Sequence, residues 1–343
     1  MRRSSEAELL RLLGERNLLA LGRAADEARA QLHPDGLVTY VIDRNVNYTN
    51  VCMSGCRFCA YFRPPGHPEA FVLPLDELRA KCLEAKGLGA TQVLLQGGLH
   101  PELRIGFYRD MLRVIKEAGL HAHCFSPPEI VHLARLEHLD VRECLEQLQS
   151  AGLDTIPGGG AEVLSDEVRS RVSPGKCTKA EWLHVMREAH SLGMRTTATL
   201  MFGMGEEPRH LAEHLLAIRE LQDETGGFTA FIPWTFQPAN TSLEGTAPSL
   251  GGYAYLKVLA VSRLALDNVT NIQASWVTQG GKVAQLALRF GANDMGSTMI
   301  EENVVRAAGV TFRLPREEIV RLIEDAGFEA RQRDCYYNVM RGG

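Results

Sequence analysis

Short apolar runs alternate with amphipathic stretches along most of this chain of 343 residues. In the amphipathic stretches, apolar residues recur every three or four positions, which is the spacing of one helix face, whereas the short runs are typical of buried strands. The clearest predicted helices are 75–89, 107–120, 141–153, 179–194 and 212–227. The predicted strands number eight: 37–43, 91–97, 120–126, 153–158, 195–203, 228–236, 269–277 and 290–296.

Strands that alternate with helices of this length indicate βαβ units and a parallel sheet. Eight such units predict an α/β fold of the TIM type, a (β/α)8 barrel, and the chain length suits a barrel of about 250 residues with additions. A helical segment at about 5–31 precedes the first strand. We therefore expect an N-terminal helical segment at 1–36 and one structural domain at 37–343, a barrel with a C-terminal extension.

Functional groups in such barrels follow the strands, in the loops at the carboxyl end. In this sequence those segments are NYTNVCMSGC, QGGLHP, SPPE, GGGAE, FGMGEE, PWTFQPANT, SWVTQGG and NDMGSTMIEEN. They hold most of the glycine clusters and many uncharged polar side chains, whereas the opposite turns read as simple helix caps. The sequence thus places the active site at the carboxyl end of the predicted barrel.

Composition narrows the class of partner. Hydrophobic residues make up 45% of the chain, and 37 basic against 42 acidic residues give a net charge of −5, so no basic surface for nucleic acid or an acidic membrane is expected. No apolar run reaches the roughly 18 residues of a membrane span. Glu6, Glu8 and Arg11 interrupt the N-terminal stretch that a signal peptide would need apolar. We expect a cytoplasmic protein that binds small molecules.

Three of the eight cysteines, Cys52, Cys56 and Cys59, lie within eight positions. In a reducing compartment such crowding points to metal binding. A structural zinc site usually takes four protein ligands, and no second C-x-x-C exists here. A [4Fe-4S] cluster held by three thiolates instead leaves one iron open to a small molecule. The other cysteines are interpreted as small buried hydrophobes: Cys82, Cys124, Cys144, Cys177 and Cys335.

The spacing C-x-x-x-C-x-aromatic-C resembles the radical S-adenosylmethionine (SAM) superfamily. The resemblance makes the three cysteines cluster ligands and Phe58 the aromatic residue near the adenine. The alternative is a zinc half-site or three unrelated thiols. The resemblance implies a [4Fe-4S] cluster and SAM as cofactors, and an external electron donor such as flavodoxin or ferredoxin.

The same resemblance implies roles for the other loops. Gly97 and Gly98 correspond to the segment at the methionine amino group, with His100 where many members carry an acid. Glu162 corresponds to the acidic residue at the ribose hydroxyls, because a carboxylate accepts from two adjacent hydroxyls. The cation for the methionine carboxylate stays open among Arg169, Arg171 and Lys176. Further predicted cofactor contacts are Tyr61, Ser126, Glu129, Gly203 and Met204.

Within the superfamily, TIPGGGAE, IPWTFQPANT and GANDMGSTMIEENV resemble the branch of menaquinone (futalosine pathway) and deazaflavin synthesis, over about residues 15–340. The resemblance implies that a radical removes hydrogen from the ribose C4′ of dehypoxanthine futalosine, a nucleoside-like substrate, and that the sugar closes onto the attached benzoate. Alternatives are aminofutalosine synthesis, the tyrosine-using step of deazaflavin synthesis, sulfur insertion, or a non-catalytic iron-sulfur electron carrier.

Strand-end positions then predict the substrate shell. Asp294 is expected after the last strand, at the barrel mouth, as a base or ribose ligand, and Glu162 is the second predicted catalytic residue. Plainer alternatives are barrel core for Trp234, turn caps for Ser126 and Asn240, and a helix first turn for Glu301. The predicted substrate contacts are Tyr48, Trp234, Gln237, Asn240, Thr241, Trp276, Asn293, Asp294, Ser297 and Glu301.

Overall fold

The computed structural model describes residues 3–340. Its strands are β1 Leu37–Val41, β2 Asp43–Asn47, β3 Gln92–Gln96, β4 His121–Cys124, β5 Thr155–Ile156, β6 Arg195–Phe202, β7 Phe228–Thr235, β8 Asn271–Ile272, β9 Asp294–Ser297 and β10 Glu329–Gln332. Its helices are α1 Glu6–Gly14, α2 Leu18–Leu32, α3 Leu75–Gly87, α4 Ile105–Glu117, α5 Pro127–Glu137, α6 Val141–Ser150, α7 Asp166–Val172, α8 Lys179–Ser191, α9 Pro208–Thr225, α10 Gly252–Ala265, α11 Trp276–Ala287, α12 Val304–Ala307 and α13 Arg316–Asp325.

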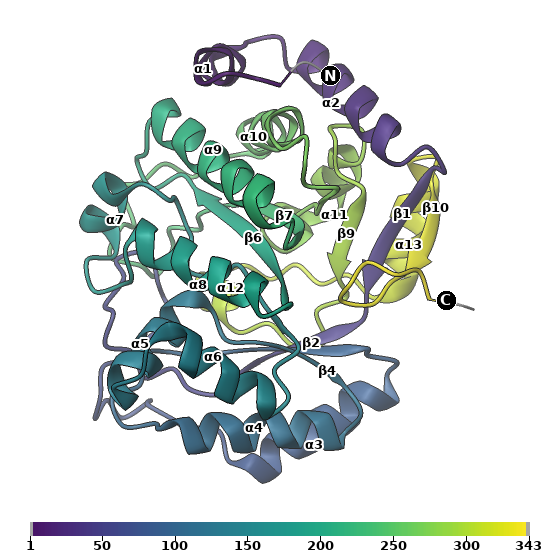
Figure 1. Ribbon diagram of the computed structural model, residues 1–343. Helices are drawn as coiled ribbons and strands as arrows, with labels where there is room; N and C mark the ends of the chain where they lie inside the picture. The colour runs from purple at the N-terminus through teal and green to yellow at the C-terminus, as the bar shows by residue number, and fades with distance from the viewer. Residues whose placement is uncertain (1–2, 341–343) are drawn as a thin grey trace.

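Strands β1 to β9 follow one another in chain order around a barrel (Figure 1). Strands β2 to β8 make a curled parallel sheet, and β1, which leads directly into β2, pairs in parallel with β9 and β10. A parallel bridge between Gln273 and Asp294 and a hydrogen bond from the Asn293 N–H to the Ile272 carbonyl (3.0 Å) join β8 to β9. These contacts close the ring, and the predicted TIM-type fold is confirmed.

The helices cover the outside of the strands with their apolar faces, as α4 illustrates. Its buried residues include Tyr108, Met111, Leu112 and Ile115, which are spaced three or four apart and so lie on one face. Gly119 follows α4 with a positive φ, and its N–H donates to the Lys116 carbonyl (2.9 Å). This ends the helix and turns the chain into β4. The periodic pattern in the sequence is therefore the core-facing stripe of each helix.

Three of the predicted strands, the first, fourth and seventh, change their bounds by more than three residues in total. The first strand continues beyond 43 to Asn47. The apolar pattern missed this extension because the inward side chains there are polar and line a cavity. The fourth and seventh shorten to β5 and β8, each of two residues. Helix α11 begins at Trp276, inside the predicted strand 269–277.

The last predicted strand also moves, from 290–296 to β9 at Asp294–Ser297. Strand β10 was not predicted; it adds to the outer edge of β1 with Leu37 opposite Glu329. Before the barrel, α1 packs on α9 and α10, and α2 packs on α10. The division into a helical segment at 1–36 and a domain from 37 onward stays a prediction.

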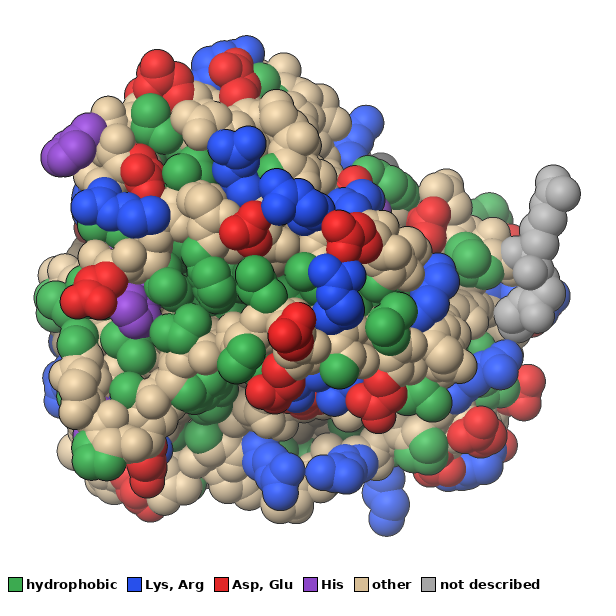
Figure 2. Space-filling model, turned by 90° about the horizontal axis from the view of Figure 1, so that it is seen from below, with side chains coloured by type: hydrophobic (Ala, Val, Ile, Leu, Met, Phe, Trp, Pro, Cys, Tyr) green, Lys and Arg blue, Asp and Glu red, His purple; other side chains and the backbone are tan. Residues whose placement is uncertain are grey.

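The outer surface carries both signs of charge. On the face in Figure 2, basic and acidic side chains are interspersed rather than gathered into one patch of a single sign. None of the described helices is long and apolar enough to cross a membrane.

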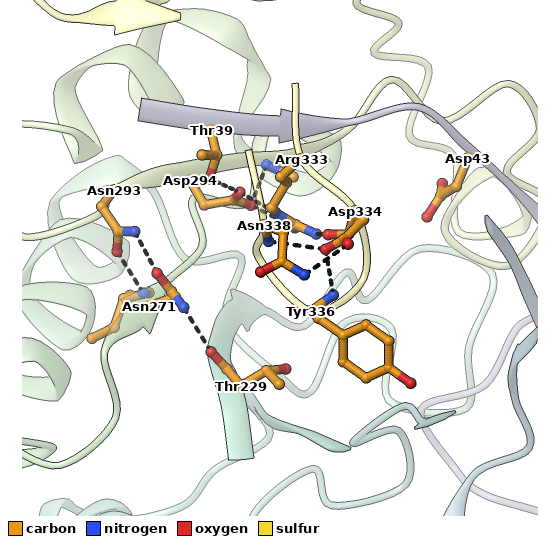
Figure 3. A network of polar contacts seen from close by, with 12 residues as sticks. Thr39, Asp43, Thr229, Asn271, Asn293, Asp294, Arg333, Asp334, Tyr336 and Asn338 are labelled. Carbon is orange, nitrogen blue, oxygen red and sulfur yellow. Dashed lines mark hydrogen bonds and ion pairs between the residues drawn. The ribbon is translucent and has the colours of Figure 1, made fainter. Parts of the chain in front are cut away.

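The chain after β10 crosses the amino-terminal end of the barrel. The Arg333 N–H donates to the Tyr40 carbonyl (2.9 Å), and the Arg333 guanidinium binds the Asp294 carboxylate in a bidentate ion pair (2.6 and 3.0 Å; Figure 3). The thiol of Cys335 lies 3.3 Å from the hydroxyl of Thr155, the first residue of β5. Both charged residues are buried, so this segment seals the barrel with an ion pair shielded from water.

We predict that Arg333→Met lowers the free energy of unfolding by about 3–5 kcal/mol, because the substitution leaves the Asp294 carboxylate buried without a counter-charge. Urea unfolding measures the change. Arg331→Met, two residues earlier on β10, is the matched control: its side chain is 42% exposed and pairs with Glu329 at the surface, so we expect less than about 1 kcal/mol. Equal effects of the two substitutions would show that the buried pair does not stabilise the barrel end.

Candidate active site

The cysteine loop follows β2 at the carboxyl end of the barrel, as the sequence predicts. Its backbone is held from two sides: the Cys52 N–H donates to the Arg63 carbonyl (3.0 Å), and the Arg57 N–H donates to the Val172 carbonyl at the end of α7 (2.8 Å). Cys56 is buried, whereas Cys52 and Cys59 are half-buried. The loop is thus a fixed element that presents three thiols.

The Gly-Gly pair after β3 supports this loop by packing. A Cβ atom at Gly98 would lie 2.1 Å from the Val51 carbonyl oxygen, and one at Gly97 would lie 2.5 Å from the ring of Tyr48. The Gly98 N–H donates to the Thr49 carbonyl (3.1 Å). Any side chain at either position would push the cysteine loop or the tyrosine beneath it away, so both positions require glycine.

The three cysteines fit a cluster better than a single ion. Within residues 3–340, no three His, Cys, Asp or Glu side chains converge closely enough to hold one metal ion. Thiols that bind separate corners of an iron-sulfur cube need not converge in this way. Cys59 and the adjacent Phe58 line an internal cavity, so an open iron on such a cluster would be accessible from that cavity.

Burial in the loop opposes ionisation of the cysteine thiols when no metal is bound. Burial raises the pKa of the Cys56 thiol to about 11 and also raises the pKa of Cys59. The ammonium of Lys176 acts in the opposite direction on both thiols, and the Ser54 hydroxyl lies 3.0 Å from the Cys56 sulfur. Bound metal ions supply the positive charge that keeps coordinating thiols deprotonated.

Glu162 and Lys176 form a pair between the cysteine loop and the cavity. Lys176 Nζ donates to Glu162 Oε1 (2.6 Å) and lies 5.2 Å from the centre of the Phe58 ring. The other carboxylate oxygen, Oε2, is buried and has no hydrogen-bond partner among the described residues. A buried acceptor without a partner is costly, so Oε2 marks a position where a ligand can donate a hydrogen bond.

The cavity itself occupies about 380 Å³ inside the barrel. A TIM barrel usually fills its interior with layers of side chains, so an open interior indicates a binding site. The predicted site residues that line it are Phe58, Cys59, Glu162, Trp234, Gln237, Trp276 and Ser297. The structure therefore brings together residues from the loops after β2 and β5, from β7 and the loop after it, and from α11 and β9.

Ser126 and Glu129, predicted to contact the cofactor, bond chiefly to the protein. Glu129 Oε2 accepts from the Ser126 N–H (2.7 Å) and hydroxyl (2.5 Å), which forms the capping box at the start of α5. Glu129 Oε1 accepts from Tyr48 (2.9 Å) and from the Gly97 N–H (3.0 Å). Burial raises the pKa of Glu129. These residues form a buried support beneath the Gly-Gly pair.

Other predicted cofactor contacts also have protein partners. Arg169 is buried and donates to the carbonyls of Gly160 (3.2 Å), Ala161 (2.6 Å) and Cys177. The N–H groups of Gly203 and Met204 donate to Glu206 (2.6 and 2.8 Å).

Two further predicted cofactor contacts lie outside the cavity lining. His100 accepts from the Glu102 N–H through Nδ1 (3.1 Å). Tyr61 is half-buried near the mouth, and burial raises its pKa to about 12.

Six of the ten predicted substrate contacts lie outside the cavity lining: Tyr48, Asn240, Thr241, Asn293, Asp294 and Glu301. Asn240 donates to the Ala307 carbonyl (2.9 Å), and the Thr241 hydroxyl donates to the Pro238 carbonyl (2.7 Å). Asn293 accepts from Arg263 (2.8 Å) beneath β9. Glu301 pairs with Arg44 (2.7 Å) and Lys81 (2.9 Å), and these contacts lower its pKa against the opposing effect of burial.

The expected position of Asp294 at the mouth was wrong. Asp294 is the first residue of β9 and lies opposite Thr39, near the amino-terminal end of the barrel. Its carboxylate accepts from the Thr39 hydroxyl (2.5 Å) and from Arg333 (Figure 3). The strand begins four residues later than the apolar pattern indicated, which moves every residue of NDMGST toward the opposite end.

Sequence reasoning missed much of the cavity wall. The missed residues include Asp43, Asn45, Gln92, Gln96, His123, Thr197, Thr199, Arg333, Cys335 and Tyr337. A signal existed: Asp43, Asn45 and Asn47 alternate in β2, and Gln92 and Gln96 lie on the same face of β3. Read as strand positions, these polar residues point into the barrel.

The missed wall is mostly neutral. Burial lowers the pKa of His123 to about 3, so its ring is uncharged at neutral pH. Burial also raises the pKa of Asp43, whose carboxylate accepts from the Gln92 amide (2.8 Å) and the Ser297 hydroxyl. The wall from β2 to β4 therefore offers hydrogen-bonding groups rather than free charges.

Two family models match the chain. Residues 46–218 match the radical SAM superfamily, and residues 225–342 match the CofH/MqnC C-terminal region. The first match contains the cysteine loop, and the second contains Trp234, Trp276 and the segment around Arg333 that seals the barrel.

Curated relatives match over nearly the whole chain. A cyclic dehypoxanthine futalosine synthase from Halalkalibacterium halodurans is 45% identical over 99% of this chain and 92% of its own length. One from Streptomyces coelicolor is 41% identical over 98% and 85%. A 5-amino-6-(D-ribitylamino)uracil--L-tyrosine 4-hydroxyphenyl transferase from Methanopyrus kandleri is 43% identical over 93% and 88%.

Solved structures agree on the fold. Methylornithine synthase superposes with a TM-score of 0.76 at 20% identity, over 96% of this chain and 94% of that one. The hydrogenase maturase HydG from Carboxydothermus hydrogenoformans superposes with a TM-score of 0.77 at 16% identity, over 98% and 77%. With its cysteine loop above an open barrel and both family matches, this chain belongs to the radical SAM superfamily, in the group of enzymes that carry the CofH/MqnC C-terminal region.

Proposed function

We propose that the protein cyclises dehypoxanthine futalosine in menaquinone biosynthesis, with a [4Fe-4S] cluster on Cys52, Cys56 and Cys59 and with SAM at the open iron. The observation that carries the proposal is the 45% identity, over 99% of the chain, to a cyclic dehypoxanthine futalosine synthase. The cavity below the cysteine loop supports it, because its volume of about 380 Å³ suits a small molecule.

Bound together, the cluster and SAM supply a 5′-deoxyadenosyl radical, so the cofactors provide the difficult chemistry. The tasks left to the chain are to hold the substrate ribose beside the cysteine loop, to bring the benzoate ring close enough to close onto it, and to exclude water. Phe58, Trp234 and Trp276 line the cavity with aromatic surface, which suits the exclusion of water. The Trp276 indole N–H donates to the Ser297 carbonyl (2.9 Å), so that ring is fixed in the wall.

Glu162 and Lys176 are the residues we assign to SAM. The unpartnered oxygen of Glu162 suits a hydroxyl donor of the ribose. Of the three candidate cations for the methionine carboxylate, Arg169 and Arg171 donate to backbone carbonyls, whereas Lys176 lies over the Phe58 ring beside the cysteines. Lys176 is therefore the cation we propose.

Asp294 is proposed as a positioning residue rather than as a base at the mouth. Its carboxylate holds the guanidinium of Arg333, and Arg333 lines the cavity. We propose that the remaining predicted contacts outside the cavity lining support the cysteine loop and the cavity mouth and do not bind SAM or substrate directly.

The second candidate function is that of the 4-hydroxyphenyl transferases, because one of them is 43% identical over 93% of the chain. Such an enzyme would take tyrosine and 5-amino-6-(D-ribitylamino)uracil in the same cavity. For either activity we propose an external one-electron donor such as flavodoxin or ferredoxin, and a cytoplasmic location.

Supplying the two sets of substrates separates the two functions. With anaerobically reconstituted protein, SAM and a reductant, we expect dehypoxanthine futalosine to be consumed and the cyclic product to be detected by mass spectrometry. We expect no adduct from tyrosine and 5-amino-6-(D-ribitylamino)uracil. The reverse pattern would replace the proposed function with the second candidate, and absence of 5′-deoxyadenosine with both sets would indicate an electron carrier.

Substitution of one cysteine tests the cluster. Cys56→Ala should abolish the iron-sulfur absorbance and reduce bound iron to background, while circular dichroism still reports the folded barrel. Cys82→Ala, which removes a buried thiol from α3, is the control and should load the cluster normally. Full iron content in Cys56→Ala would contradict the assignment of three ligands.

Glu162→Gln tests the cofactor contact. Because hydrogen bonds to charged groups contribute about 1.5–3 kcal/mol, we expect SAM affinity to fall by about tenfold or more, with the cluster retained. Calorimetric titration of the reconstituted protein with SAM measures the change. Glu181→Gln, in the capping box of α8, should bind SAM like the parent protein. Unchanged SAM affinity in Glu162→Gln would remove Glu162 from the cofactor site.

A further inference from the structure

One wall of the cavity holds two buried hydrogen-bond acceptors that the protein leaves unused. Asn45 on β2 is 7% exposed and Gln92 on β3 is 4% exposed, and both line the cavity. Neither Asn45 Oδ1 nor Gln92 Oε1 has a hydrogen-bond partner among residues 3–340. Buried polar atoms are almost always satisfied in native proteins, so two on one wall require an explanation.

The strand register brings the two residues to the same surface. Asp43 pairs with Gln92 and Asn45 pairs with Leu94 in the parallel ladder of β2 and β3. Asp43 and Asn45 are two residues apart on one strand, so their side chains point to the same face. Asp43, Asn45 and Gln92 therefore form one continuous strip, which we call the acceptor strip.

The chemistry of the strip is set by its internal bonds. Gln92 donates its Nε2 to Asp43 Oδ2 (2.8 Å), which fixes the amide so that Oε1 is the free atom. The other carboxylate oxygen of Asp43 already accepts from the Ser297 hydroxyl. The strip thus combines two acceptor oxygens without a partner among the described residues with the Asn45 amide N–H2, which donates. A ligand hydroxyl, which both donates and accepts, suits it, whereas a ligand carboxylate could use only the Asn45 amide and would lie near the Asp43 carboxylate.

We infer that the acceptor strip of Asn45 and Gln92 recognises the sugar hydroxyls of the substrate, and that the carboxylate end of the substrate lies against another wall. This inference rests on the proposed function, since dehypoxanthine futalosine carries both groups. It assigns a specificity-determining role to β2 and β3, which lie below the cysteine loop. A polyhydroxylated substrate of the second candidate function would use the same strip.

Asn45→Leu separates this role from a structural one. Leucine has nearly the shape of asparagine, and it removes a buried acceptor that has no partner among residues 3–340, so the melting temperature should stay the same or rise. Loss of the hydrogen bond should raise the Kd for dehypoxanthine futalosine about tenfold. Calorimetry with the oxidised, cluster-loaded protein and SAM avoids turnover, because no reductant is present.

Asn268→Leu is the matched control. Asn268 Oδ1 is likewise buried without a partner, but the residue lies outside the cavity lining, and its Nδ2 donates to Arg219 (2.9 Å) and Asp223 (2.7 Å). This variant should lose thermal stability and keep the parent affinity. Benzoate, which has the carboxylate and the ring without hydroxyls, is the matched ligand, and Asn45→Leu should leave its Kd unchanged.

The outcomes are distinct. A Kd of Asn45→Leu for dehypoxanthine futalosine within about twofold of the parent value overturns the inference, as does an equal loss of benzoate affinity or a large fall in melting temperature. If the parent protein binds 5-amino-6-(D-ribitylamino)uracil instead and Asn45→Leu weakens that binding, the strip stands and the proposed function fails. If the parent protein binds neither compound, both fail. Gln92→Met should repeat the Asn45→Leu result.

Discussion

The buried ion pair between Arg333 and Asp294 closes the amino-terminal end of the barrel, and the internal cavity depends on that closure. A barrel packed with layers of side chains needs no separate plug, but this one keeps about 380 Å³ open. The segment after β10 therefore closes the barrel end that packed side-chain layers would otherwise close. Within it, the Tyr337 ring lies 3.8 Å from the Arg333 guanidinium, and Cys335 lies against Thr155. Because this segment is also part of the cavity wall, the same contacts set the shape of the site.

An open interior allows polar groups that a packed core would exclude. Asn45 and Gln92 keep unpartnered oxygens in the wall, and each is a cost to folding that a bound ligand can offset. Hydrogen-bonding groups that lack a partner and so lower folding stability are expected at functional sites. In the same wall, burial holds His123 uncharged, and the Asp43 carboxylate bonds to Gln92 and Ser297.

At the carboxyl end of the barrel, the cysteine loop packs on residues whose polar groups bond to other parts of the protein. Glu129 binds Tyr48, Ser126 and Gly97, the glycine pair packs against Tyr48 and Val51, and the loop lies on top. Several residues that the family resemblance placed at the cofactor belong to this support. Motif position along the chain therefore indicates a region of the barrel, while the hydrogen bonds decide which atoms have no partner among the described residues, as is the case for Glu162 Oε2.

The sequence by itself determined the barrel class, the order of its units and the three cysteines, because periodicity and local spacing depend on residues close in the chain. It failed where polar residues occupy strands: DRNVN was not predicted as β2, and Asp294 was expected at the mouth rather than at the start of β9. Only the tertiary structure decided that Arg333, nearly 40 residues after Asp294, neutralises it, and that Asn45 Oδ1 and Gln92 Oε1 have no hydrogen-bond partner among the described residues. Those outcomes depend on strand register and ring closure, which bring distant residues together and which no local pattern encodes.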